Sequence, residues 1–147
     1  MKGLVALLIV SGTAVLAETD PGRRALAEVP ESARPVHNPL ASDAAAPVHG
    51  MKLFHQHCAM CHGATGGGSK VAPPLNGSDM KAATAGEIFW VISNGVAFYG
   101  MPAWSNLTET QRWQIVAFLR MLNASPGPGH AEEMAKSVVW SPSPSRR

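Results

Sequence analysis

The chain has 147 residues, which is enough for one domain with extra segments at its ends and too few for two full domains. Its formal net charge is +2 at pH 7, and this near balance gives no sign of a nucleic-acid partner. The 14 Gly and 12 Pro lie mostly outside the segments with an apolar pattern, so the folded part should be smaller than the total length.

The first 17 residues have the pattern of a secretory signal. Lys2 is followed by an apolar run over residues 4–10 and by a stretch of small residues that ends at Ala17. An uncleaved membrane anchor is the alternative, but a span needs about 20 apolar residues and polar or small residues interrupt this run from Ser11 onward. We therefore expect a signal peptide over residues 1–17, cleavage after Ala17 and a periplasmic mature protein.

Two segments rich in helix-breaking residues flank the centre of the chain. Residues 18–47 contain five prolines among Ala, Ser and charged residues and show no apolar periodicity, so we expect a flexible spacer. Residues 124–147 contain a Pro-Gly-Pro-Gly run and end in Ser-Pro-Ser-Pro-Ser-Arg-Arg, which predicts a Pro-rich tail. Within this tail, residues 131–140 favour one brief helix that ends at Trp140. The folded domain is expected over residues 48–123.

The central part has helix signals and no alternating strand pattern, so we expect an all-α fold. A first helix over about residues 49–57 carries Leu53 and Phe54 as apolar residues and leads into a pair of cysteines. A second helix should begin at Thr84. Glu87 lies three positions on, and the two residues form a capping box in which each side chain binds a backbone amide.

The second helix should end at Gly95, because a glycine readily takes the left-handed conformation that stops a helix. A third helix repeats the capping box with Thr108 and Gln111. Its apolar stripe consists of Ile115, Phe118, Leu119 and Leu122. A core of about 75 residues is near the lower limit for folding on apolar burial alone, so a bulky cofactor is expected to complete it.

Residues 58–62 read Cys-Ala-Met-Cys-His and contain the only two cysteines of the chain. In a C-x-x-C-H motif the two thiols lie on one side of a helical turn, where each can add to a vinyl group of haem while the histidine reaches the iron. A disulfide, a thioredoxin-like pair and half of a zinc site are the alternatives. The chain has no βαβ pattern and no closely spaced further zinc ligands, and a disulfide leaves His62 unexplained. We expect Cys58 and Cys61 to hold one haem c, with His62 on its iron.

A second axial ligand decides between electron transfer and chemistry at an open iron. We predict Met101, because Gly100 and Pro102 place it in a loop from which its sulfur can approach the iron opposite His62. His with Met is a common ligand pair for covalently attached haem. The rival methionines lie in the attachment turn, a polar connector and the third helix: Met60, Met80 and Met121. Three nearby histidines are expected to lie on a polar helix face without a functional role: His49, His55 and His57.

In combination, these residues resemble the class I cytochrome c family over about half of the chain. Gly50 with Phe54 is similar to the family's first helix, where glycine allows the last helix to cross closely and the aromatic ring packs against one such as Phe118. Pro73, in the sequence Pro-Pro-Leu, is similar to the family's Pro-x-Leu segment. The proline carbonyl of that segment accepts a hydrogen bond from the haem-ligating histidine. Residues 100–104 are similar to the distal-methionine loop of short bacterial members, including domains of oxidase and dehydrogenase subunits.

The resemblance implies a small class I cytochrome c fold of three main helices around one haem c, and an electron carrier rather than an enzyme. It implies redox partner proteins, with a dehydrogenase as donor and an oxidase or reductase as acceptor. It also implies no nucleic acid, no small-molecule substrate, and membrane association only through a partner or an uncleaved leader. Because the charge of the folded segment is nearly balanced, docking is expected to depend on a small apolar rim.

Three other functions use the same motif and stay open at this stage. An enzyme such as a peroxidase would keep the sixth position of the iron free, and its ferrous form would bind carbon monoxide readily. A gas or redox sensor would have a methionine that ligands displace slowly. A thiol oxidoreductase would have free or disulfide-linked cysteines in the purified protein.

Overall fold

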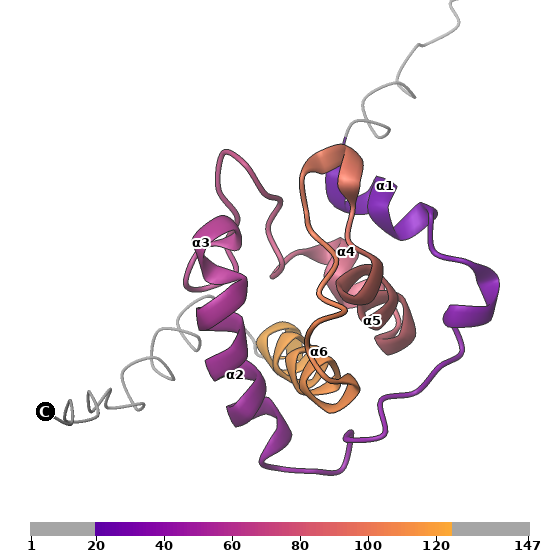
Figure 1. The fold of residues 1–147 in the computed structure, drawn as a ribbon, viewed down its shortest axis with the longest axis vertical. Coiled ribbons are helices and arrows are strands. Elements are labelled where there is room, and N and C mark those ends of the chain that lie inside the picture. Colours follow the sequence, from indigo (N-terminus) through magenta and orange to yellow (C-terminus); the bar gives the residue numbers. More distant parts are fainter. Residues whose placement is uncertain (1–19, 125–147) are drawn as a thin grey trace, which may run out of the picture.

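The computed structural model describes residues 20–124, and within them the chain is helical with no extended strand. The predicted signal peptide, the tail from residue 125 onward and its expected helix over residues 131–140 lie outside the described residues. The α-helices are α1 (Pro21–Ala27), α2 (Ala46–His57), α3 (Ala59–His62), α4 (Ser78–Ala82), α5 (Ala85–Asn94) and α6 (Glu109–Ala124), with 3₁₀ helices η2 (Glu31–Ala33) and η3 (Ala97–Tyr99) (Figure 1). The predicted all-α class is confirmed. No helix in this part of the chain has the length and apolar character needed to cross a membrane.

Helices α2 and α6 pack closely at the centre of the domain. A Cβ atom at Gly50 would overlap the backbone carbonyl of Gln114, so only glycine fits at this crossing. One turn later, the fully buried Phe54 ring lies 5.2 Å from the Phe118 ring, centroid to centroid. The glycine crossing and the aromatic pair expected from the sequence are confirmed. The helix begins earlier than predicted, at Ala46 rather than His49.

Capping boxes begin both α5 and α6, as the sequence predicts. At α5 the Thr84 amide donates to Glu87 Oε2 over 2.6 Å, and the Glu87 amide donates to Thr84 Oγ1 over 3.2 Å. At α6 the Thr108 amide donates to Gln111 Oε1 over 2.8 Å, and the Gln111 amide donates to Thr108 Oγ1 over 3.2 Å. The backbone turns out of α5 at Gly95, which has a φ of +70°. These local signals place the two helices that supply most of the core.

The hydrophobic core lies along one face of α6 and is completed by α2 and α5. Its buried side chains are Met51 and Phe54 from α2, Ile88 and Ile92 from α5, and Trp113, Ile115, Val116, Phe118 and Leu119 from α6, together with Ala83 and Leu107. The Phe89 ring stacks on the Trp113 ring with centroids 3.9 Å apart. Several core side chains from α5 and α6 also line a cavity, so the core and the candidate site share one wall.

The segment before α2 is folded against the helices, and the prediction of a flexible spacer over residues 18–47 is wrong for its described part. Ala25 and Val29 are buried, and Arg34 forms an ion pair with Glu87 over 3.0 Å. Figure 1 shows the segment passing from α1 around α5 and α6 to the start of α2. Its few apolar contacts are widely spaced along the chain, and many of its contacts with the helices are polar. The sequence of this segment therefore shows no helical or strand periodicity that would predict its folding.

Candidate functional site

A cavity of about 800 Å³ lies between α3, α5 and the loops that follow them. This volume is at the upper end of the range for small-molecule and cofactor pockets. Its lining is mainly apolar and includes Leu26, Phe54, Leu75, Ile88, Val91, Ile92, Ile115 and Leu119. The five residues predicted for the site from sequence also line it: Cys58, Cys61, His62, Pro73 and Met101. The fold therefore brings every predicted site residue to one cavity.

Helix α3 is a single turn that presents both cysteines and the histidine. The His62 amide donates to the Cys58 carbonyl over 2.9 Å, so the two thiols are held one turn apart. Gly63 ends the turn with a φ of +77°, a left-handed conformation that favours glycine. Cys58 is half-buried and Cys61 is exposed. Both cysteines line the cavity although they differ in burial.

The Cys58 thiol is shifted toward its protonated form. Burial raises its pKa from the ordinary value of 9.0 to about 11, and the neighbouring Cys61 adds to the rise. Because the thiolate is the reactive form of cysteine, Cys58 is a poor nucleophile at neutral pH in the folded, haem-free chain.

The ring of His62 is buried and held in one orientation. Its Nδ1 atom lies 3.0 Å from the carbonyl oxygen of Pro73. A carbonyl can only accept, so Nδ1 carries the hydrogen and Nε2 keeps its lone pair for a metal ion. The hydrogen bond that the family resemblance implied is therefore present.

A glycine-rich loop carries Pro73 back to His62. The amide of Gly68 donates to the carbonyl of His62 over 2.9 Å, and the amide of Leu75 donates to the carbonyl of Gly66 over 2.7 Å. Gly68 has a φ of +82°, and a Cβ there would lie 2.7 Å from the Pro74 nitrogen. Gly66 and Gly68, which both have positive φ, therefore allow the close backbone approach beside the histidine.

Met101 is fixed by a tight backbone turn after α5. The amide of Val96 donates to the Met101 carbonyl over 2.9 Å, and the Met101 amide donates back to the Val96 carbonyl over 3.2 Å. Gly95 and Gly100 have positive φ values, and a Cβ on Gly95 would lie 2.6 Å from the Met101 carbonyl oxygen. The methionine therefore projects from a rigid loop. In Figure 1 this loop, drawn in orange after α5, lies apart from α3.

The other methionines differ in how close they come to the cavity. Met80 of α4 lines it together with Met101. Met60 is 92% exposed, and Met121 packs against the hydrophobic core. Two methionines thus remain as candidates for the iron on position alone, and Met101 is the one held in a loop.

Sequence reasoning missed several residues of the cavity wall. His57, expected on a polar surface, lines the cavity, and its ring lies 5.1 Å from the Trp104 ring. Residues 20–26 of the presumed spacer supply a further part of the wall. No local signal marks either feature, because both depend on how distant segments pack.

The donor set and the cavity fit a covalently attached haem. Two thiols one turn apart, an imidazole with a free Nε2 and a thioether converge on a cavity whose apolar lining suits a macrocycle. Among residues 20–124, no group of three or more His, Cys, Asp or Glu side chains is arranged to hold a metal ion.

Comparison with protein families identifies the relatives of this site. The family described as cytochrome c oxidase, cbb3-type, subunit III matches residues 45–119, just over half of the chain. The search of curated proteins and the search of solved structures gave no match. The matched residues contain the cysteine pair, the oriented histidine and the methionine loop. The chain therefore belongs to this family of class I c-type cytochrome domains, and its cofactor is covalently bound haem c.

Proposed function

We propose that this chain transfers single electrons between redox partner proteins in the periplasm, through a haem c whose iron is held by His62 and Met101. The observation that carries this proposal is that one apolar cavity is lined by both thiols, an oriented imidazole and a loop methionine. Membership of the cytochrome c family supports haem-based electron transfer as the general function.

The chain's residues have distinct parts in this proposal. Cys58 and Cys61 would tether the cofactor, and Pro73 would keep His62 in the tautomer that binds iron. When bound, haem c supplies a one-electron couple between ferric and ferrous iron. Met101 would supply the second protein ligand to the iron, and the iron would then have no free position for a substrate. Thioether ligation also favours the ferrous form relative to a second histidine, which raises the reduction potential.

Exposed apolar side chains near the cavity support docking through an apolar rim. Val71 lines the cavity and is 72% exposed, while Phe98, 85% exposed, precedes the cavity residue Tyr99. Met60, inside the attachment turn, is 92% exposed. We propose this rim (Met60, Val71 and Phe98) as the surface that meets a dehydrogenase as donor and an oxidase or reductase as acceptor.

The leader pattern supports the proposal that the protein is exported and meets its partners in the periplasm. If residues 1–17 are removed as proposed, mass spectrometry of the mature protein will find Glu18 at its N-terminus, with the mass of one haem added.

Optical spectra of the exported protein test the ligands directly. We expect the ferric protein to show methionine ligation and the ferrous protein to resist carbon monoxide. Met101→Ala should abolish the methionine signature and allow rapid carbon monoxide binding. Met80→Ala, which changes the other methionine of the cavity, is the matched control and should leave both properties intact.

Other outcomes would exclude the proposal. An unchanged spectrum in Met101→Ala would remove this residue from the iron. Rapid carbon monoxide binding and peroxide turnover by the unaltered protein would favour the open-site enzyme instead. A colourless mature protein with two alkylatable thiols would exclude haem attachment itself.

A further inference from the structure

Residues 20–40, here called the N-terminal strap, form part of the cavity although the family match begins only at residue 45. The strap lines the cavity with residues of α1 and its N-cap: Asp20, Pro21, Gly22, Ala25 and Leu26. Ala25 is buried, and Leu26 packs against the hydrophobic core. The strap therefore supplies a part of the cavity wall that lies outside the region matched by the family.

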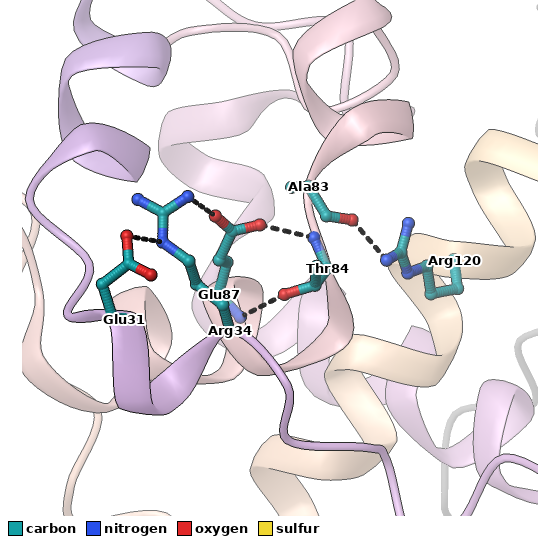
Figure 2. A network of polar contacts seen from close by, with 6 residues as sticks. All are labelled: Glu31, Arg34, Ala83, Thr84, Glu87 and Arg120. Carbon is teal, nitrogen blue, oxygen red and sulfur yellow. Dashed lines mark hydrogen bonds and ion pairs between the residues drawn. The ribbon is translucent and has the colours of Figure 1, made fainter.

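An ion pair between the partly exposed Arg34 and the buried Glu87 fastens the middle of the strap to α5. Arg34 Nη1 lies 3.0 Å from Glu87 Oε1, and the Glu87 side chain is 9% exposed (Figure 2). The second carboxylate oxygen of Glu87 accepts the Thr84 amide of the capping box. On the other side of this turn, Arg120 of α6 donates to the Ala83 carbonyl (Figure 2). Because a buried carboxylate needs a partner, losing Arg34 would leave Glu87 uncompensated.

The strap backbone also approaches α5 more closely than any side chain would allow. A Cβ at Gly86 would overlap the Ala33 carbonyl oxygen and lie 3.0 Å from that of Val36. Farther along, Asn38 Nδ2 donates to the Trp113 carbonyl of α6 over 3.0 Å. The strap is thus anchored to both helices that carry the core.

At its beginning the strap lies against the segment that orients His62. A Cβ at Gly22 would stand 3.7 Å from Pro73 Cβ, which is ordinary van der Waals contact. Arg23 pairs with Asp79 of α4 over 3.0 Å and holds this end of α1 across the cavity wall. Pro73 is therefore enclosed between His62 on one side and the strap on the other.

We propose that the N-terminal strap closes the Pro73 side of the haem cavity against water and thereby raises the reduction potential of the haem. This inference rests on the proposed electron-transfer function. An apolar, water-excluding shell favours ferrous over ferric haem, because the ferric form carries the extra positive charge. The strap residues act through the cavity wall and the Pro73 segment, so they are positioning residues.

The decisive variant is Gly86→Ala in the full-length exported holoprotein. Alanine is a better helix former than glycine, but its Cβ at position 86 would collide with the strap backbone. Gly77→Ala is the matched control, because nothing lies within 4 Å of a Cβ at Gly77. Trypsin cleavage between Arg24 and the buried Ala25 of α1 reports strap opening, and potentiometry measures the reduction potential of the haem.

We expect Gly86→Ala to speed trypsin cleavage after Arg24 by about tenfold or more, because overpacking raises the population of the open form. Its reduction potential should shift below that of the unaltered protein, while Gly77→Ala should match the unaltered protein in both measurements. Faster cleavage with an unchanged potential would overturn the inference, because the strap would then be mere packing. Unchanged cleavage would overturn the attachment itself.

A second variant keeps the test valid if Gly86→Ala does not fold. Arg34→Gln combined with Glu87→Gln removes the ion pair without leaving a buried charge, and glutamine still completes a capping box. We expect smaller changes in the same two directions, and no change in either would also overturn the inference. An unaltered protein without covalent haem or a reversible redox couple would instead refute the proposed function.

Discussion

At the scale of single residues, α3 shows how much chemistry one helical turn can organise. The turn fixes two thiols and an imidazole, and the Pro73 carbonyl settles which ring nitrogen of His62 carries hydrogen. Cys58 and Cys61 differ in burial although only two residues separate them. Their reactivity in the haem-free chain should differ accordingly.

The raised pKa of Cys58 predicts a pH-dependent difference in alkylation. A pKa of about 11 instead of 9.0 lowers the thiolate fraction at pH 8 by up to about a hundredfold. In the folded haem-free chain, iodoacetamide should therefore modify Cys58 more slowly than Cys61. The Cys58 rate should keep rising toward pH 11. Timed mass spectrometry measures both rates, and denaturant should make them converge. Equal rates in native buffer would show that burial does not protect Cys58.

At the scale of elements, the crossing of α2 and α6 depends on Gly50. Gly50→Ala should lower the free energy of unfolding by about 1 to 3 kcal/mol, because the added methyl group overlaps the Gln114 carbonyl. Denaturant unfolding of the holoprotein measures this change. Gly77→Ala again serves as control and should cost less than about 1 kcal/mol, since it alters only the N-cap of α4. A loss of equal size in both variants would contradict the assignment of Gly50 to the crossing.

The helices that sequence predicts well are those with local signals. Thr84 with Glu87 and Thr108 with Gln111 mark two helix starts, and Gly95 marks a stop, because capping and left-handed turns depend on neighbouring residues alone. The short helices α1 and α4 were not predicted. They lack an apolar stripe and are held by distant contacts such as the ion pair between Arg23 and Asp79.

The same difference between local and long-range signals explains which residues of the site could be predicted from the sequence. The C-x-x-C-H motif and the glycine–methionine–proline loop are local patterns, so Cys58, Cys61, His62 and Met101 were predicted and all line one cavity. His57 and the strap were missed, because tertiary packing alone brings them there. Sequence also left Met80 beside Met101 as a rival, and position in the cavity does not separate them.

At the scale of the whole molecule, the proposed apolar rim predicts how two copies of the protein exchange electrons. Phe98→Ser should slow electron self-exchange between ferrous and ferric protein, because it removes an 85% exposed aromatic ring next in sequence to the cavity residue Tyr99. NMR line broadening of mixed redox states measures the rate without any partner. Val48→Ser changes an exposed valine on α2 that does not line the cavity and should leave the rate unchanged.

The dependence of the self-exchange rate on ionic strength is a second test of the same surface. A rim without strong charge predicts a self-exchange rate that changes little between low and high salt. A steep salt dependence, or equal losses in Phe98→Ser and Val48→Ser, would contradict docking through the rim.

The fold of the strap bears on where a minimal cytochrome unit can be cut from this chain. A shortened protein that starts at residue 45, where the family match begins, would lack the cavity residues Ala25 and Leu26. It would also lack Arg34, the ion-pair partner of Glu87. A transplantable module therefore has to start no later than Asp20, whose carboxylate caps the first helix. Fusions designed on the shorter boundary would carry a haem pocket with one side missing.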